Sequence, residues 1–331
     1  MTEPGGCAKN KGYTGQWVQP LRWALASLLL VYALYIVIGD NQTIQAVRQI
    51  PLWLAPLLIF VVISYEAMAS IRLFIIGRLA NVKNITPFQW YRLHLVGQLG
   101  NLLLPQAGNI YRALTLKRSH AVPYSRFLEM TILKIWIELT LALCIIFLIF
   151  SIYQKSLPND YKLVIGILGL LVVIVVSLPF ISKTTSSALL NIPLQRHVKS
   201  FWIRAYSSSE FLTIAVTKKS FLLHISIVTT AMLALSAFAQ FLGFSALGVE
   251  TSARELSILV ILLRISNYVI LTPGNLGVRE IAYAISANAM GINMADAILV
   301  SMMIRGASYL NILTLGLLFG WREILTKKTK S

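Results

Sequence analysis

The chain has few charged residues for its length. Only 12% of its 331 residues are Asp, Glu, Lys or Arg, whereas 57% are hydrophobic, and the mean hydropathy is +0.73. A soluble domain needs more polar surface than this composition provides. The sequence therefore predicts a polytopic membrane protein whose apolar helices face lipid.

Acidic residues and cysteines are scarce as well. The 12 acids are outnumbered by 29 Lys and Arg, which gives a formal net charge of +17. In a membrane protein such an excess is typical of cytoplasmic loops, so we expect no nucleic-acid partner. Cys7 lies in a polar N-terminal tail and Cys144 lies in an apolar segment. No disulfide framework is therefore expected.

Long hydrophobic runs recur along the chain. A membrane-crossing helix requires ~20 predominantly apolar residues. Six runs reach that length: 21–39, 51–79, 127–152, 163–182, 221–244 and 295–319. The first run has no small-residue cleavage site and is followed by further spans, so we expect an uncleaved first helix. The predicted fold class is all-α, with about six full spans.

Two further apolar stretches, 88–110 and 256–289, are interrupted by proline and glycine. Broken backbone at membrane depth must be buried in protein or line a cavity, because lipid offers its amides no partners. We therefore predict two re-entrant hairpins of half-length helices. We call their breaks the first tip, residues 105–112, and the second tip, residues 273–280. Their sequences are Pro105-Gln-Ala-Gly108-Asn-Ile-Tyr-Arg112 and Pro273-Gly-Asn-Leu-Gly277-Val-Arg-Glu280.

The distribution of basic residues predicts the orientation. Lys and Arg are enriched in three segments, 1–20, 183–219 and 322–330. Because cytoplasmic loops carry the excess of Lys and Arg, these segments and both termini are expected in the cytoplasm. With six spans, the first hairpin then enters from the cytoplasm and the second from outside. The sequence thus predicts two inverted halves, 51–152 and 221–319, within a single transmembrane domain.

The tip sequences resemble a known family. They are similar to the membrane region of lysylphosphatidylglycerol synthases, which also occurs as free-standing flippase-like proteins beside glycosyltransferases. The resemblance covers roughly residues 51–319 and is carried by Thr272-Pro-Gly-Asn-Leu-Gly-Val-Arg-Glu280 and Asn101-Leu-Leu-Leu-Pro-Gln-Ala-Gly-Asn-Ile-Tyr-Arg-Ala113. Two residues depart from the family pattern: Asn275 replaces a second glycine, and Asn109 stands where relatives often have an acid.

The resemblance implies a function. It implies a bacterial-type, multi-pass inner-membrane protein that moves a phospholipid or lipid-linked (glyco)lipid between leaflets. Because only a short basic segment follows the last span, we expect no soluble aminoacyl-transferase domain and no lysyl transfer from tRNA. The chain is accordingly expected to be no enzyme and to need no cofactor.

The tips have a chemistry suited to anions. Glycine permits positive φ, and the free amides and positive dipole at a helix start can hold a lipid phosphate. Arginine adds bidentate phosphate contacts. The alternative is that Arg112 and Glu280 only cap or pair within packed hairpins. The expected substrate-binding residues of the tips are Asn101, Pro105, Gly108, Arg112, Pro273, Gly274, Asn275, Gly277, Arg279 and Glu280.

Four further charged residues fall inside predicted spans. Glu66, Lys134, Glu138 and Arg305 would each be costly in lipid, so they normally face a partner or a wet cavity. Lys134 and Glu138 are four positions apart and would share a helix face, where an ion pair is possible. We predict that the four residues line the same polar interior as the tips. The alternative is that they form fixed ion pairs that only hold helices together.

The remaining polar features give weaker indications. His94 and His224 are isolated, so we interpret them as ordinary polar contacts rather than metal ligands, and no metal site is expected. The segment 194–206 interleaves aromatic and basic residues. That pattern is typical of an interfacial helix on an anionic membrane surface, and a solvated connector is an equal interpretation.

Two functions of other classes remain open. One is an intramembrane lipid transferase, although metal-assisted transfer commonly needs close carboxylates and the sequence contains no Asp-x-Asp. The other is a noncatalytic partner of a glycosyltransferase or another lipid-synthesis enzyme in the cell envelope, with the basic loop as the contact. A homodimer is possible in each case.

Overall fold

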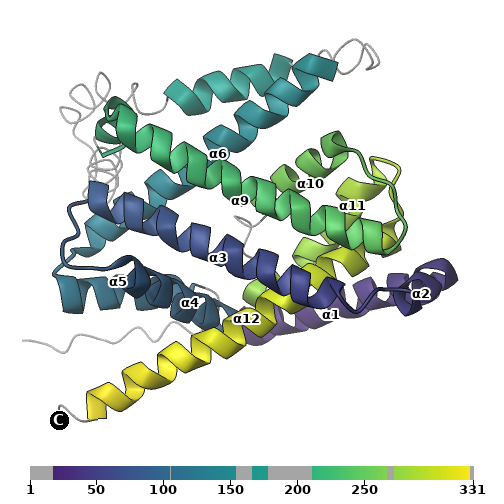
Figure 1. Ribbon diagram of the computed structural model, residues 1–331, viewed down its shortest axis with the longest axis horizontal. Helices are drawn as coiled ribbons and strands as arrows, with labels where there is room; N and C mark the ends of the chain where they lie inside the picture. The colour runs from purple at the N-terminus through teal and green to yellow at the C-terminus, as the bar shows by residue number, and fades with distance from the viewer. Residues whose placement is uncertain (1–17, 105, 154–165, 178–210, 267–271, 329–331) are drawn as a thin grey trace, which may run out of the picture.

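The structure is a computed structural model that describes residues 18–104, 106–153, 166–177, 211–266 and 272–328. Within these residues every regular element is a helix, as Figure 1 shows. The predicted all-α class of a polytopic membrane protein is therefore confirmed.

Four helices contain a segment that is long and apolar enough to cross a membrane. Their apolar sequences run without proline or glycine breaks strong enough to end the helix, so the hydrogen-bonded backbone continues across the span. They confirm four of the six predicted full spans. The helices are α3 (Leu54–Leu79), α6 (Tyr124–Tyr153), α9 (Lys219–Ala246) and α12 (Met294–Lys328).

The two other predicted spans are described differently. The first is α1 (Val18–Gly39), which is followed by α2 (Asn41–Arg48) after a bend of 83°. The two helices are long and apolar enough to cross a membrane only when they are taken together. Of the predicted span 163–182, only the helix Gly166–Ser177 is described. Cys7, the segment 194–206 and most of the basic loop lie outside the described residues.

Besides α2 and the helix Gly166–Ser177, four described helices are shorter than the ~20 residues that crossing a bilayer requires. They form two consecutive pairs, as predicted. The first pair is α4 (Pro87–Leu103) and α5 (Ala107–His120). The second is α10 (Ala253–Ser266) and α11 (Val278–Asn288), joined through the 3₁₀ turn η2 (Pro273–Asn275). Each half of the chain therefore has the order long helix, short pair, long helix.

The two short pairs start from opposite ends of one helix pair. At one end, Leu54 and Leu58 of α3 cluster with Leu242 of α9, and at the other Ile76 clusters with Ile225. Helices α3 and α9 are therefore antiparallel. Because α4 follows the end of α3 and α10 follows the end of α9, the hairpins begin at opposite ends, and Figure 1 shows them there.

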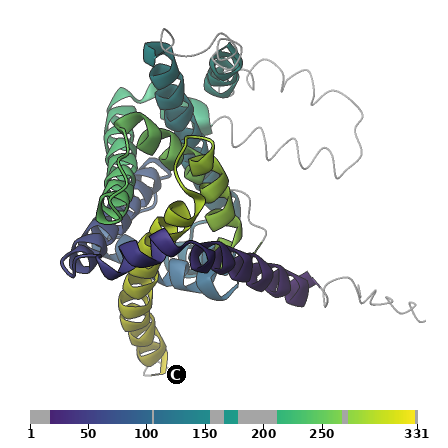
Figure 2. The same ribbon diagram turned by 90° about the vertical axis from the view of Figure 1, so that its right-hand side faces the viewer.

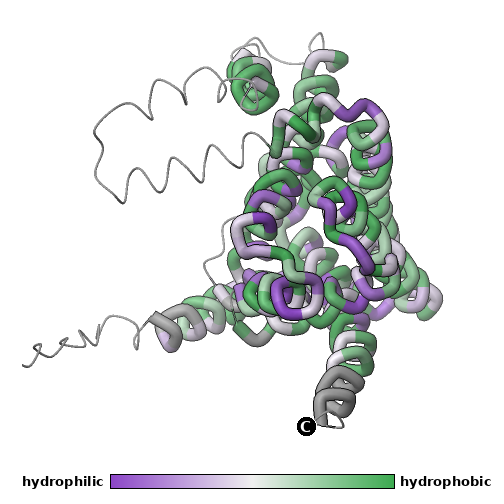
Figure 3. The backbone as a smooth tube through the Cα atoms, turned by 90° about the vertical axis from the view of Figure 1, so that its left-hand side faces the viewer, coloured by the Kyte–Doolittle hydropathy of each residue, from purple (hydrophilic) through white to green (hydrophobic). Residues whose placement is uncertain are grey.

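The distribution of polarity is that of a membrane protein. Large apolar side chains such as Leu28, Phe60 and Leu148 are mostly exposed, whereas Glu66 and Glu280 are buried. Figure 3 shows that hydrophobic residues dominate the helices. An apolar exterior suits lipid, which cannot solvate charge, so these charged groups lie inside the protein.

Helix α1 is held to α12 by a small polar network at its end. Asn293 Nδ2 donates a hydrogen bond of 2.6 Å to Asp40, and Thr43 Oγ1 donates one of 2.8 Å to Asp296. The bond from Asn293, followed by that from the Gln42 amide, lowers the pKa of Asp40. Figure 2 shows α1 crossing α12. The first helix is thus anchored beside the second hairpin.

Candidate functional site

The first tip is closed by a glycine contact and an asparagine cap. Asn101 Oδ1 accepts a hydrogen bond of 2.8 Å from the amide of Gly108, the second residue of α5. A Cβ atom at Gly108 would lie 1.8 Å from the carbonyl oxygen of Gly97. Only glycine permits this approach of α4 and α5. Pro105, the remaining predicted residue of this tip, lies outside the described residues.

The second tip is a run of left-handed backbone. Gly274, Asn275 and Gly277 have φ values of 58°, 58° and 79°. Asparagine tolerates this conformation better than most side chains, which explains how Asn275 occupies a position where the family pattern has glycine. Its Nδ2 also donates to the carbonyl of Ser266 at 3.3 Å. The predicted need for positive φ at this tip is met.

Glu280 and Arg305 tie the second tip together. Glu280 accepts a hydrogen bond of 2.8 Å from the amide of Gly277 and forms a buried ion pair with Arg305. Arg305 also donates to the carbonyls of Gly274 and Asn275, at 3.4 and 3.3 Å. The carboxylate thus both caps α11 and pairs with a cation. For Glu280 and Arg305 the geometry favours the structural alternative over direct substrate contact.

The two tips meet. The turn η2, which begins at Pro273, contacts α4. A Cβ atom at Gly274 would lie 3.8 Å from Leu102 Cδ2 at the end of α4, and 3.3 Å from the Tyr309 hydroxyl of α12. Hairpins that begin at opposite ends of the α3–α9 pair therefore end against each other inside the protein.

Glu138 joins three helices. Its carboxylate lies 2.8 Å from Arg72 of α3 and 3.8 Å from Arg264 of α10. Arg264 in turn donates to the Tyr65 hydroxyl and stacks on the Tyr65 ring. Glu138 thus pairs with these arginines rather than with Lys134, the partner considered from the sequence. Lys134 interacts with Glu138 only through longer-range electrostatics.

Glu66 pairs with a histidine. Its Oε2 lies 2.5 Å from His94 Nε2 of α4, and both side chains are buried. Arg112 interacts electrostatically with Glu66, and its Nη1 donates to Asn109 Oδ1 at 3.1 Å. His94 is therefore a polar contact, as its isolation in the sequence predicted.

These groups form one connected set, which we call the polar interior. Lys134 interacts electrostatically with Arg72, Arg112 and Arg264. Arg279 does so with Arg264, Glu280 and Arg305, which connects the second tip to the same set. The members are Glu66, Arg72, Arg112, Lys134, Glu138, Arg264, Arg279, Glu280 and Arg305. All predicted charged site residues belong to it.

The polar interior carries more positive than negative charge. It contains six basic side chains and three carboxylates. Glu138 and Glu280 lie within 4 Å of arginines, and Glu66 lies against His94. Among the described residues, Arg112, Lys134 and Arg279 form no ion pair at that distance. Buried cations in excess favour the arrival of an anion, so we treat the polar interior as a candidate anion site.

Sequence reasoning missed three members or neighbours of the polar interior. Arg72 and Arg264 lie inside apolar stretches. The high cost of a charge in lipid, which drew attention to Glu66, therefore applies to them equally. His94 was recognised only as an isolated histidine. Its pairing with Glu66 depends on how α3 and α4 face each other, which no local pattern in the sequence reveals.

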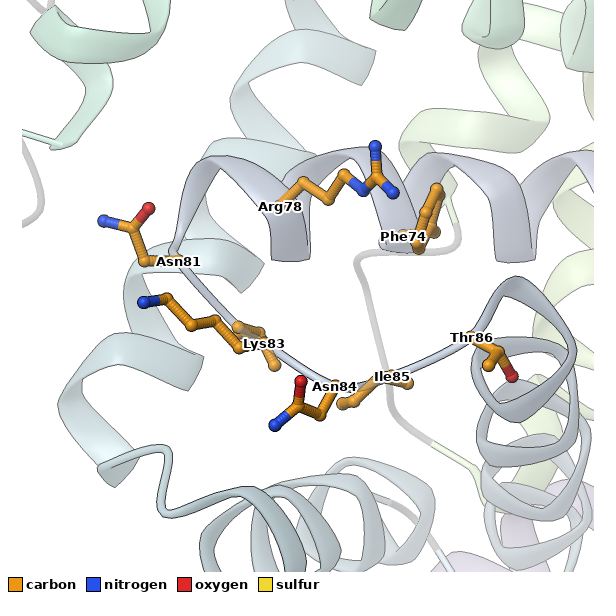
Figure 4. Close-up of a pocket in the computed structure, with 8 residues that line it drawn as sticks. Phe74, Arg78, Asn81, Lys83, Asn84, Ile85 and Thr86 are labelled. Carbon is orange, nitrogen blue, oxygen red and sulfur yellow. The ribbon is translucent and has the colours of Figure 1, made fainter.

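A separate pocket lies at the surface. It is lined by Phe74, Arg78 and residues 81–86, where α3 ends and the chain turns toward α4. Figure 4 shows Arg78 and Phe74 projecting from the helix, and Asn81, Lys83 and Asn84 from the loop. None of the predicted site residues lines this pocket, so we place the candidate site at the tips.

Comparison with known proteins agrees with the resemblance seen in the tips. The family model described as the lysylphosphatidylglycerol synthase TM region matches residues 23–316, a range that contains both tips and the whole polar interior. No curated protein and no solved structure matches the chain. The protein therefore belongs to the family of the lysylphosphatidylglycerol synthase TM region.

Proposed function

We propose that the protein moves an anionic phospholipid or lipid-linked (glyco)lipid between the two leaflets of the cell inner membrane. Membership of the family indicates a function related to membrane lipids, and the apolar helices indicate a multi-pass membrane protein. The observation that carries the finer proposal is the meeting of two short hairpins, begun at opposite ends of α3 and α9, at an interior rich in buried cations.

The hairpins supply the two-sided access that translocation needs. In transporters built from inverted halves, broken helices meet near the bilayer midplane and the substrate site lies between them. With both termini in the cytoplasm, the first hairpin enters from the cytoplasmic leaflet and the second from the outer leaflet. Each hairpin then reaches the polar interior from its own side.

The polar interior supplies the headgroup contacts. Arg112 on α5 and Arg279 on α11 each follow a tip, and neither forms an ion pair within the described residues. A guanidinium binds a phosphate through two parallel hydrogen bonds, which are stronger than neutral ones. The acyl or isoprenoid chains stay in the bilayer along the apolar exterior. The headgroup crosses between Arg112 and Arg279, with Lys134 alongside.

Reconstitution tests the proposal. Purified protein is placed in liposomes that contain tail-labelled fluorescent phosphatidylglycerol, and exchange is followed by quenching the outer leaflet with dithionite. Replacing Arg112 by Gln should slow exchange about tenfold or more, because a charge-assisted hydrogen bond is lost. Arg118→Gln, on the exposed end of the same helix, is the matched control and should leave the rate within about twofold.

The outcomes separate the function classes. Translocation is supported if lipid exchange is faster with the protein than in empty liposomes. The acceleration should be lost in Arg112→Gln and kept in Arg118→Gln, with both variants as thermally stable as the natural protein. Equal rates in the two variants would contradict the role of the first tip. A covalently altered lipid would indicate a transferase. If neither lipid exchange nor a covalent product is seen, also with a lipid-linked sugar as the substrate, the protein would instead be a scaffold for another envelope enzyme.

A further inference from the structure

The charge of Arg112 is not neutralised by its nearest partner. Its side chain is buried, with only 7% of its surface exposed, and Nη1 donates to the neutral amide of Asn109 at 3.1 Å. The Nε and Nη2 atoms have no hydrogen-bond partner among the described residues. A Cβ atom at Gly97 would lie 2.3 Å from Arg112 Nε, so glycine makes the room that this guanidinium occupies.

The groups around Arg112 add to this positive charge. Glu66 is the carboxylate that interacts with Arg112, but its Oε2 is already engaged by His94 at 2.5 Å. Lys134 also interacts electrostatically with Arg112 and brings a second cation. Arg279 adds a third cation to the polar interior at the second tip, where it interacts with Arg264, Arg305 and Glu280. Buried charge of one sign is costly unless a counter-charge arrives.

From this charge balance, and resting on the proposed function, we infer that the substrate headgroup carries at least two negative charges, as a phosphomonoester or a diphosphate. We further infer that the neutral side chain of Asn109 sets this preference. The headgroup phosphate of phosphatidylglycerol is a diester with a single charge, which leaves two of the three unpaired cations uncompensated. A phosphomonoester carries about −1.5 to −2 near neutral pH.

Asn109 determines the charge at the first tip. Aspartate has nearly the shape of asparagine, and at this position it would place a carboxylate within hydrogen-bond distance of Arg112. The resulting ion pair would remove one positive charge from the polar interior without removing any of its cations. Asn109 is therefore a specificity-determining residue, while Arg112 makes the phosphate contact.

A ligand series with one tail and increasing charge tests the inference. The probes are farnesyl methyl phosphate, farnesyl monophosphate and farnesyl diphosphate, bound near neutral pH to the full chain in detergent, with dissociation constants measured by thermophoresis. For the natural sequence we expect affinity to rise about tenfold or more from the diester to the monoester, and further to the diphosphate. Farnesol measures the contribution of the tail alone.

Two substitutions isolate the role of Asn109. Asn109→Asp should weaken diphosphate binding about tenfold or more while changing diester binding far less, so that the charge preference shrinks. Asn109→Ser is the matched neutral variant, since it loses the hydrogen bond to Arg112 without adding charge, and it should keep the preference. The melting temperature of each variant is measured without ligand to exclude misfolding.

The results distinguish this inference from the proposed function. If the natural protein binds the diester and the monoester with equal affinity, the inferred substrate class is wrong. If Asn109→Asp and Asn109→Ser show the same preference for the diphosphate over the diester, the inferred role of Asn109 is wrong. Reconstituted protein is then assayed for exchange of a fluorescent polyprenyl diphosphate. Charge-dependent binding without exchange of this or any other labelled lipid would leave the site assignment standing and refute translocation.

Discussion

The two hairpin tips solve the problem of buried charge in different ways. At the second tip, Glu280 is held by the Gly277 amide and by Arg305, and Arg305 also bonds two tip carbonyls. At the first tip, Arg112 faces only the neutral Asn109 at hydrogen-bond distance among the described residues. The carboxylate of the second tip is neutralised by Arg305, and only Arg279 of that tip forms no ion pair among the described residues, whereas Arg112, the one charge of the first tip, has a neutral hydrogen-bond partner.

Two tips of similar sequence therefore need not have equal roles. A neutralised, hydrogen-bonded pair such as Glu280 and Arg305 resists rearrangement, because breaking any part leaves a buried group without a partner. An uncompensated cation instead favours the arrival of an anion. We therefore expect substitutions of Glu280 and Arg305 to affect mainly stability, and the removal of Arg112 to affect mainly lipid exchange.

The largest effect is expected for Glu280→Gln. This change leaves Arg305 buried without its counter-charge, which typically costs about 3–5 kcal/mol. The measurement is the melting temperature and the monodisperse fraction after solubilisation, with Glu250→Gln at an exposed position as the control. The double variant Glu280→Gln with Arg305→Met should recover part of the loss. A melting temperature unchanged by Glu280→Gln would remove the distinction between the tips.

Closing the first hairpin depends on Gly108. Gly108→Ala forces a methyl group against the Gly97 carbonyl and should cost about 1–3 kcal/mol through overpacking. Gly306→Ala on α12, where a Cβ meets nothing within 4 Å, is the matched control and should be neutral or stabilising by up to about 1 kcal/mol. Equal melting temperatures for the two variants would show that α4 and α5 do not pack as closely as described.

Much of this arrangement follows from local sequence. Uninterrupted apolar runs predict α3, α6, α9 and α12, and the Pro-Gly tips predict the short pairs, because those residues cannot continue a helix without stranding backbone groups. That the two hairpins begin at opposite ends of the α3–α9 pair is expected from counting the spans between them. What identified Glu66, Glu138 and Arg305 was the cost of charge inside an apolar run.

The pairing of those charges does not follow from the sequence. Lys134 and Glu138 are four positions apart on one helix, yet Glu138 pairs with Arg72 and Arg264 from two other helices. Which partner is chosen depends on the rotation of α3, α6 and α10 about their axes, and that rotation is set by packing along their whole length. His94 finds Glu66 for the same reason.

A smaller effect is expected at Asn275. Asn275→Ala keeps a Cβ atom in left-handed backbone and loses the bond to Ser266, which should cost about 1–2 kcal/mol. Asn275→Gly relieves the backbone and should lie within about 0.5 kcal/mol of the natural protein. The comparison of the two melting temperatures separates backbone conformation from hydrogen bonding. If Gly and Ala were equally destabilising, the side-chain bond would be the main contribution.

The smallest effect is expected for the partly exposed acid Asp40, which contrasts with the buried Glu280. Hydrogen bonds from Asn293 and then the Gln42 amide lower the pKa of Asp40 below its usual value, so the folded state favours the charged form. Its contribution is fully present above the pKa of an unfolded Asp, and it is lost as pH falls through the folded value. The natural protein should therefore melt at a slightly higher temperature than Asp40→Asn near neutral pH, by an amount that does not change with pH there. In strong acid the two melting temperatures should converge. A difference that widened on acidification would show that the α1–α12 contact does not depend on this charge.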